Sequence, residues 1–101
     1  MQGPETRLRK KIVAAMLLVW PKAYVRKIHG NAFQNIGVPD LICCIEGLFF
    51  GLEIKCPGKK ATPAQVLEGR KIVLAKGSFA VVTSVNETLD FVKKELKRRL
   101  L

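Results

Sequence analysis

The sequence predicts an α/β protein with the element order αβββαβα and a mixed central sheet flanked by helices. Capping-box signatures that begin at Thr62 and Ser84 mark the starts of two helices. Two β-type runs joined by Glu46-Gly47 indicate a hairpin, and the helix after it leads to a further strand, as in a βαβ crossover. The 101 residues suit one domain that spans 1–101.

The first helix is expected to begin at Pro4 or Glu5, because a proline at the first helical position loses no hydrogen bond. Pro21 ends it. Its apolar stripe follows helical spacing through Leu8, Ile12, Val13, Met16, Leu17 and Trp20. Stepping back three residues from Leu8 brings Glu5 to the edge of that stripe, so this carboxylate is expected to face the body of the protein.

Three β-type segments are expected next. Ala23–His29 has residues that favour strands, and Gly30–Pro39 is a loop rich in Gly and Asn. Leu41–Ile45 and Leu48–Lys55 then form the arms of the hairpin.

The second helix has clear start and stop signals. Thr62 is a good N-cap, Pro63 takes the first helical position, and Gln65 completes the capping box. Gly77 stops the helix. Because the capping box by itself explains Gln65, a role for its side chain in a functional site is a second hypothesis beside it.

A last strand over Phe79–Ser84 and a final helix complete the chain. The second capping box, from Ser84 to Glu87, opens that helix. One side of the helix is apolar, and the other carries Lys93, Lys94, Lys97, Arg98 and Arg99. These cations either form a solvated face or contact phosphates.

The charge balance indicates a polyanionic partner. Eighteen Lys and Arg residues against eight Asp and Glu residues leave a formal net charge of +10. Such an excess is typical of proteins that bind nucleic acid or an anionic membrane surface. The longest apolar run, Ile12–Trp20, has nine residues, whereas a membrane-spanning helix needs about 20. It resembles a secretory signal in following basic residues, but no small-residue cleavage site comes after it, which favours a folded helix.

The three cysteines, Cys43, Cys44 and Cys56, favour an intracellular, cytoplasmic protein with buried thiols. Zinc ligation together with His29 is the alternative. It does not suit adjacent cysteines, because neighbouring residues on a strand point to opposite faces. His29 itself is interpreted as a hydrogen-bonding residue at a strand end.

The register of the hairpin brings two carboxylates together. If Glu46 and Gly47 are the two turn residues, Ile45 faces Leu48, and continuing outward brings Asp40 opposite Glu53. Lys55 lies two residues beyond Glu53 and therefore shares its face of the sheet. A divalent cation with oxygen ligands would neutralise the two like charges.

This group of residues suits phosphodiester hydrolysis. Mg²⁺ held by Asp40 and Glu53 would polarise a phosphate and lower the pKa of a bound water. Lys55 would orient that water or stabilise the developing charge. Glu5 is a further candidate ligand, although an acidic residue in a first helical turn is also explained by the helix dipole.

Two short runs carry a resemblance to a known family. Gly37-Val38-Pro39-Asp40-Leu41-Ile42, followed by Leu52-Glu53-Ile54-Lys55, resembles the PD…ExK signature of the PD-(D/E)xK nuclease superfamily. The surrounding residues 28–65 most resemble the VRR-NUC family of virus-type replication and repair nucleases.

The resemblance implies a restriction-endonuclease-like core and a role for each matching residue. Asp40, Glu53 and the main-chain carbonyl of Ile54 match the metal ligands, and Lys55 matches the catalytic lysine. Glu5 matches the acidic residue of the first helix, and Gln65 the glutamine after the ExK strand. The resemblance to stand-alone phage and viral members also implies a homodimeric endonuclease that uses Mg²⁺ or Mn²⁺. Its expected substrate is branched DNA, including four-way (Holliday) junctions, in DNA repair.

The sequence therefore predicts a metal-dependent, structure-selective DNA endonuclease, without a membrane partner and as a homodimer. The candidate DNA-binding residues are Lys59, Lys60, Arg7, Lys10 and Lys11. Two alternatives stay open: a non-catalytic basic module that binds nucleic acid, and a nuclease that acts on flaps or ends. An assay with several DNA structures and Mg²⁺ separates them.

Overall fold

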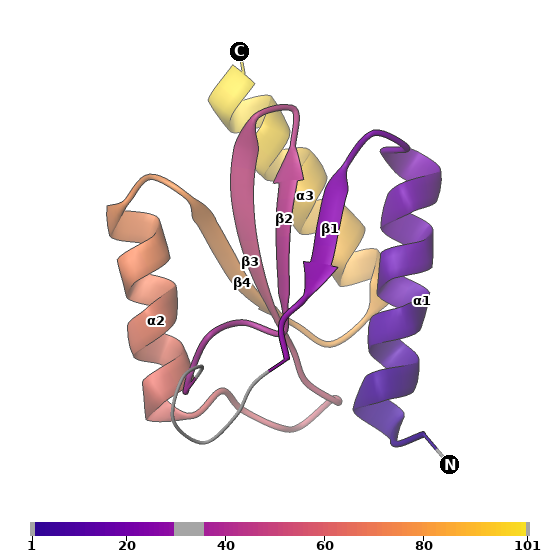
Figure 1. Ribbon diagram of the computed structural model, residues 1–101, viewed down its shortest axis with the longest axis vertical. Coiled ribbons are helices and arrows are strands. Elements are labelled where there is room, and N and C mark those ends of the chain that lie inside the picture. Colours follow the sequence, from indigo (N-terminus) through magenta and orange to yellow (C-terminus); the bar gives the residue numbers. More distant parts are fainter. Residues whose placement is uncertain (1, 30–35, 101) are drawn as a thin grey trace.

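A computed structural model describes residues 2–29 and 36–100 of the chain. Its helices and strands follow the predicted order αβββαβα (Figure 1). They are α1 (Pro4–Val19), β1 (Tyr24–Lys27), β2 (Leu41–Ile45), β3 (Leu48–Ile54), α2 (Pro63–Leu74), β4 (Ser78–Val82) and α3 (Val85–Leu100). Among the described residues, no helix is long and apolar enough to cross a membrane.

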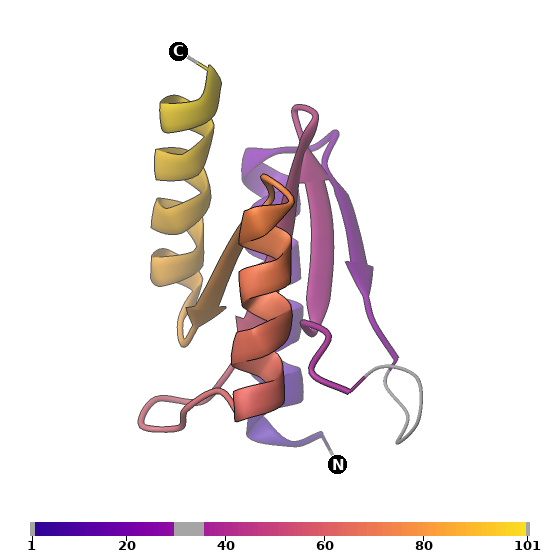
Figure 2. The same ribbon diagram turned by 90° about the vertical axis from the view of Figure 1, so that its left-hand side faces the viewer.

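The four strands form one mixed sheet in the order β1-β2-β3-β4. β1 and β3 both run antiparallel to β2, whereas β4 runs parallel to β3. The α2 helix makes the crossover between these two parallel strands (Figure 2). The predicted fold class, α/β with a mixed sheet and flanking helices, is confirmed.

The predicted register of the hairpin is also confirmed. Ile45 pairs with Leu48, and the pairing continues outward as far as Leu41 and Leu52. Both turn residues have positive φ angles, 52° at Glu46 and 83° at Gly47. Two positive φ angles characterise the tight turn whose twist matches that of the strands it joins.

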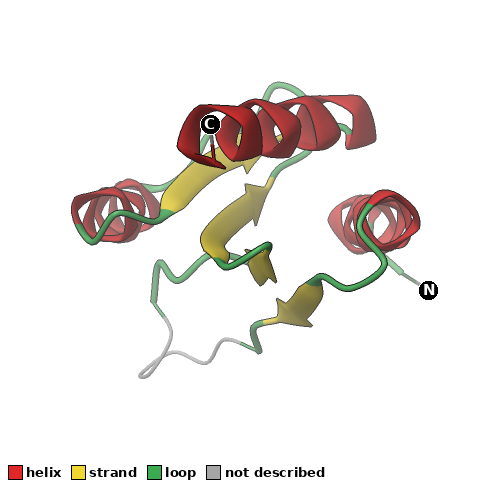
Figure 3. Ribbon diagram, turned by 90° about the horizontal axis from the view of Figure 1, so that it is seen from above, coloured by secondary structure: helices red, strands yellow, loops and turns green. Residues whose placement is uncertain are grey.

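The core lies on one face of the sheet, beneath α1 and α3. Alternate residues of β2 and β3 point into it, together with apolar side chains of the two helices and of β4. The buried members are Ile12, Met16, Leu41, Cys43, Ile45, Phe50, Leu52, Ile54, Val82, Val92 and Leu96. Figure 3 shows the sheet between this pair of helices and α2, which packs on β3 and β4. Because side chains alternate along a strand, Glu53 belongs to the α2 face.

Some predicted boundaries were wrong by one or two residues. The first strand is shorter than Ala23–His29, and β3 ends at Ile54 instead of Lys55. The last strand ends at Val82 because the Ser84 hydroxyl accepts a hydrogen bond from the Glu87 backbone N–H at 3.0 Å and so begins α3. The residues 30–35 of the predicted loop Gly30–Pro39 lie outside the described residues.

The two predicted capping boxes differ in detail. At α2 both bonds of the box are present, between Thr62 and Gln65. At α3 the Glu87 carboxylate accepts from the backbone N–H of Thr83, one residue before the N-cap, at 2.6 Å. The start of α3 is therefore capped by Ser84 while its acidic partner ties down the end of β4.

A glycine holds the segment before β2 against the first turn of α2. Gly37 has a φ of +81°, and a Cβ added there would lie 2.5 Å from the carbonyl oxygen of Ala64. Only a residue without a side chain permits this approach. The contact brings the segment that leads to Asp40 next to the turn that carries Gln65.

We expect Gly37→Ala to lower the free energy of unfolding by more than Gly58→Ala, measured by urea denaturation. Gly58 also has a positive φ, +88°, but nothing lies within 4 Å of an added Cβ. Both variants carry the backbone cost of about 1–3 kcal/mol, and the collision adds to it only at Gly37. Equal losses in the two variants would contradict this account.

Candidate functional site

The predicted site residues come from four elements that meet at one end of the sheet. β2 begins and β3 ends there, and α1 and α2 both begin near that end, at the bottom of Figure 1. The hairpin supplies Asp40 and Glu53, Lys55 follows β3, and the helices supply Glu5 and Gln65.

Asp40 is held at the end of the hairpin by its own backbone and side chain. Its carbonyl oxygen accepts a hydrogen bond from the N–H of Ile28 at 2.8 Å. Its Oδ2 accepts one from the N–H of Ile54, also at 2.8 Å. The carboxylate thus spans from the start of β2 to the end of β3, beside the residue whose carbonyl was predicted to bind a metal.

Glu53 is the buried carboxylate of the site. The residue is only 2% exposed, and its Oε2 accepts a hydrogen bond from Nε2 of Gln65 at 3.1 Å. The Nζ of Lys55 lies 3.6 Å from the same oxygen, so the predicted proximity of Lys55 and Glu53 is confirmed. The other oxygen, Oε1, is buried and has no hydrogen-bond partner among the described residues.

The surroundings of Glu53 favour its protonated form. Burial raises the pKa of Glu53 to about 8, and the neighbouring Asp40 carboxylate raises it as well, whereas Lys55 acts in the opposite direction. A buried carboxylate beside a second acidic group is costly to ionise without another cation. The nearby lysine therefore leaves this pair of carboxylates only partly neutralised.

These donors fit a small divalent cation. The Oε1 of Glu53 is an oxygen acceptor without a partner among the described residues, and the Glu53 carboxylate lies near that of Asp40. Among the residues that the structure describes, no three His, Cys, Asp or Glu side chains come together closely enough to hold a metal ion. Mg²⁺ typically takes one or two carboxylates and completes its shell with water and substrate phosphate. A site with two carboxylates suits this coordination preference of Mg²⁺.

Glu5 lines a small cleft together with Asp40. The cleft has a volume of about 170 Å³, and its lining residues are Glu5, Thr6, Arg9, Lys27, Asp40 and Ile54. The Oε2 of Glu5 accepts a hydrogen bond from the backbone N–H of Cys56 at 3.4 Å. Glu5 therefore faces the body of the protein, as predicted, and a place in the shell of a metal stays a prediction.

Gln65 makes contacts that serve both of the roles considered for it. Its Oε1 accepts from the Thr62 N–H in the capping box at 2.8 Å, while its Nε2 donates to Glu53. One side chain thus links the start of α2 to the buried carboxylate. The two hypotheses for Gln65 are compatible.

The five predicted DNA-binding cations are all exposed. Lys59 and Lys60 lie in the loop between β3 and α2, and the others, Arg7, Lys10 and Lys11, are on α1. The basic end of α3 is placed differently, because α3 ends at the opposite end of the molecule (Figure 1). Arg98 there donates two hydrogen bonds to Glu95, which satisfies part of that charge within the helix.

Two cations of the cleft, Arg9 and Lys27, were missing from the sequence prediction. Arg9 lies four residues after Glu5 on α1, and this spacing places both on one side of the helix. Lys27 pairs with Leu41, the residue after Asp40, in the β1–β2 ladder. The helical spacing was available in the sequence, whereas the pairing of β1 with β2 was not, since no tight turn joins them.

Cys43 and Cys44 lie within β2, whereas Cys56 and His29 border the cleft through contacts with Glu5 and Lys27. Cys43 is buried and Cys44 exposed, as expected for neighbours on a strand, and burial raises the pKa of Cys43 to about 12. The Nδ1 of His29 lies 3.4 Å from the Nζ of Lys27. The expectation that all three thiols are buried was wrong, because Cys44 lies on the face of β2 opposite the core.

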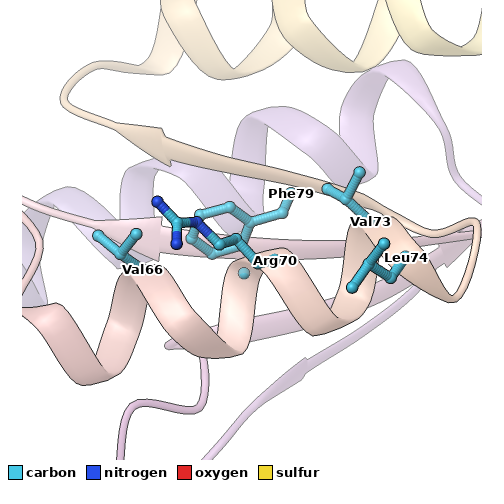
Figure 4. A pocket seen from close by; sticks show the side chains of 6 residues that line it. Val66, Arg70, Val73, Leu74 and Phe79 are labelled. Carbon is cyan, nitrogen blue, oxygen red and sulfur yellow. The ribbon is translucent and has the colours of Figure 1, made fainter.

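An apolar groove lies between α2 and Phe79 of β4 (Figure 4). It has a volume of about 410 Å³ and is lined by Val66, Gly69, Arg70, Val73, Leu74 and Phe79. Gly69 permits the close packing of α2 on β4, because an added Cβ would lie 2.4 Å from the Phe79 ring. Leu67, Val73 and Leu74 of this helix are exposed apolar side chains, and a contiguous patch of such side chains is typical of an interaction surface.

Comparison with solved structures identifies the fold. One described as a "VRR_NUC domain" superposes with a TM-score of 0.68 and 21% sequence identity, covering 96% of this chain and 97% of its own. A second, a "VRR_NUC domain protein", gives 0.71 and 18%, covering 96% and 91%. No family model matches the sequence, and no curated protein sequence matches it. The chain thus has the fold of VRR_NUC domains, as its motifs predicted.

We expect the stability of the metal-free protein to fall as pH rises from about 5 to 8. The folded chain keeps the proton of Glu53 until its pKa of about 8, whereas the unfolded chain releases it near 4.5. The unfolded state then binds fewer protons, so unfolding becomes easier by up to about 1.4 kcal/mol per pH unit. Urea denaturation in EDTA measures this.

Glu53→Gln should remove that part of the pH dependence, because the amide does not titrate. Glu46→Gln, in the exposed hairpin turn, is the matched control and should keep the wild-type profile. If Glu53→Gln and the wild type lose stability in parallel across this range, the burial of an ionisable Glu53 is not its cause.

Proposed function

We propose that this protein is a metal-dependent endonuclease that hydrolyses phosphodiester bonds in DNA. The observation that carries the proposal is the buried carboxylate of Glu53, which lies near Asp40. One of its oxygens has no partner among the described residues, and a lysine lies at the other. The names of the two similar structures, which describe VRR_NUC domains, agree with a nuclease. The net charge of +10 supports a polyanionic substrate.

Asp40, Glu53 and the main-chain carbonyl of Ile54 would hold Mg²⁺ or Mn²⁺, with Glu5 as a candidate for the outer shell of the ion, through a water. When bound, the ion supplies Lewis-acid polarisation of the phosphate and lowers the pKa of a water. The hydrogen bond from the Ile54 N–H directs Asp40 toward the end of β3. The Nε2 of Gln65 donates to the Oε2 of Glu53 and so orients that carboxylate. The Oε1 of Glu53 is then the oxygen available for a metal.

Lys55 is the proposed catalytic cation. Its Nζ is 3.6 Å from Glu53 Oε2, and its side chain is 14% exposed, so it is tethered yet reachable from solvent. From there it can donate a hydrogen bond to the attacking water or to a phosphate oxygen on which charge develops. A mostly buried ammonium group is effective in this role because the surrounding dielectric constant is low.

The proposed substrate is branched DNA, with four-way junctions as the first candidate. The predicted phosphate-contacting cations are exposed on α1 and on the loop between β3 and α2, and the sequence contains no base-reading motif. Contacts to the phosphate backbone position a protein on DNA without reading its sequence. Selection by DNA shape is therefore the form of recognition that these surfaces support.

We expect the purified protein to cut a synthetic four-way junction in Mg²⁺ or Mn²⁺, resolved by denaturing gel electrophoresis. Asp40→Ala and Lys55→Ala should each lower the cleavage rate by at least about 100-fold, since each removes a group from the reacting centre. Flap, duplex and single-stranded substrates tested in parallel identify the preferred structure. An end- or flap-directed nuclease would prefer those substrates to the junction.

In the same assay, Gln65→Glu tests the contact between Gln65 and Glu53. The variant keeps an acceptor for the Thr62 N–H in the capping box but places a second carboxylate against Glu53. Cleavage should fall, and thermal stability in EDTA should fall as well, because a like charge replaces the hydrogen-bond donor of the buried Glu53. If the wild-type protein binds the junction but cuts nothing with either metal, the protein is a non-catalytic binding module.

We also propose that the protein is a homodimer that associates through the apolar groove of α2. Two copies of a chain with a charge of +10 repel each other, so contact is favoured where apolar side chains replace cations. Arg70 is the one cation among the described residues that line the groove. The charge of the nearby Lys71 is partly compensated by Glu68, at 3.5 Å. A two-fold contact of α2 with its copy would leave the acidic end of the sheet open to DNA.

Leu74→Glu should convert the dimer to a monomer, measured by size-exclusion chromatography with light scattering. Leu74 lines the groove and is 81% exposed, so a charge there prevents self-association without disturbing the fold. Leu18→Glu is the matched control, because Leu18 is 83% exposed on α1, outside the groove. A monomeric wild type, or equal masses for the two variants, would contradict the proposal.

A further inference from the structure

Two neighbouring hollows between α1 and β1 share the same pair of cations. The first is the cleft of about 170 Å³ that contains Glu5 and Asp40. The second, of about 340 Å³, is lined by Arg9, Lys10, Val13, Ala14, Val25 and Lys27. Since Arg9 and Lys27 line both, the hollows form one groove, the α1–β1 groove, which leads away from the acidic residues.

The sequence periods explain why these side chains meet. Glu5, Arg9 and Val13 recur every four residues, which places them on one side of α1. Val25 and Lys27 alternate with the residues between them, and they pair with the core residues Cys43 and Leu41. They therefore lie on the sheet face that α1 covers. α1 begins at the acidic end of the sheet and β1 ends there. Each element therefore places its cation, Arg9 or Lys27, nearer to that end than its valine.

The charges of the groove are available for an anion. Neither Arg9 nor Lys27 forms an ion pair with any carboxylate that the structure describes, although Asp40 and Glu5 line the same cleft. Arg9 is half-buried and Lys27 exposed, with its Nζ 3.4 Å from His29 Nδ1. The floor beyond them is apolar, with Val13, Ala14 and Val25.

We propose that the α1–β1 groove binds the DNA strand that enters the cleavage site. Arg9 and Lys27 hold the phosphate next to the one that is cut, Lys10 adds a third cation beside them, and the sugar or base that follows lies on the apolar floor. Arg9 and Lys27 are positioning residues, since they place the strand while the carboxylates and Lys55 act on it. The inference rests on the proposed nuclease function.

The order of groups along the groove carries the proposal. Arg9 and Lys27 line the cleft that contains Asp40, a proposed metal ligand, and they also line the adjoining hollow with its apolar side chains. This suits an adjacent phosphate that lies between a scissile phosphate and a nucleoside. Successive phosphates of one strand repeat the same charge at a short interval, so a cationic site directly beside a metal site strengthens binding.

The test measures the binding of fluorescently labelled junction DNA in EDTA, so that no cleavage occurs. The double variant Arg9→Ala/Lys27→Ala should bind roughly tenfold or more weakly, and the slope of log K against log salt should fall by about 1–2. The control double variant, Lys22→Ala/Lys76→Ala, loses the same charge from exposed residues at the opposite end of the sheet and should bind as the wild type does. Arg9→Lys/Lys27→Arg should restore most of the affinity.

A second measurement locates the contact. Single uncharged methylphosphonate linkages are scanned along one strand of the junction. At one position, the methylphosphonate linkage should weaken binding of the junction to the wild type. It should cause no further loss of affinity in Arg9→Ala/Lys27→Ala, because the cations that contact that phosphate are already absent. In the Mn²⁺ reaction the double variant should raise KM more than it lowers kcat.

The outcomes separate the two proposals. If the wild type cuts no DNA, the nuclease proposal fails, and the binding measurements in EDTA still decide whether the groove holds phosphates. If the wild type cuts DNA but Arg9→Ala/Lys27→Ala matches the control double variant in affinity and salt slope, the groove does not carry the strand. The absence of any linkage with a variant-dependent effect leads to the same conclusion.

Discussion

The tight turn at Glu46 and Gly47 sets the register on which the acidic site depends. Because both residues adopt positive φ angles, β2 and β3 pair without a bulge from Ile45 and Leu48 outward. A shift of one residue would exchange the two faces of β3 and move Glu53 from the α2 side into the apolar core. The geometry of a turn near one end of the hairpin thus determines which side chains meet at the other.

Burial then gives the site its chemical character. Glu53 lies under α2, and one of its oxygens has no hydrogen-bond partner in the described part of the chain. Such a carboxylate is costly in a protein unless protonation or a cation compensates it. The same packing that excludes water from Glu53 brings Gln65 and Lys55 to its other oxygen. Stability and the proposed cation site therefore depend on the same contacts.

The basic residues are divided among surfaces with different surroundings. The α1–β1 groove adjoins the acidic cleft, whereas the basic end of α3 lies at the far end of the molecule and pairs in part with Glu95. The outer side of α2 is mainly apolar instead. The net charge in the composition does not show this division. In the folded chain, the cations of the α1–β1 groove lie beside Glu5 and Asp40, whereas the groove of α2 is mainly apolar.

The sequence by itself determined the element order, the hairpin register and the start of α2, because these depend on turn residues and caps that act over a few positions. The meeting of Asp40, Glu53 and Lys55 followed from the register and the period of a strand. Only the tertiary structure decided that Lys27 lies beside Asp40 and faces α1, since β1 pairs with β2 across a long connection. The burial of Glu53 likewise depends on α2, which no local pattern places over the sheet.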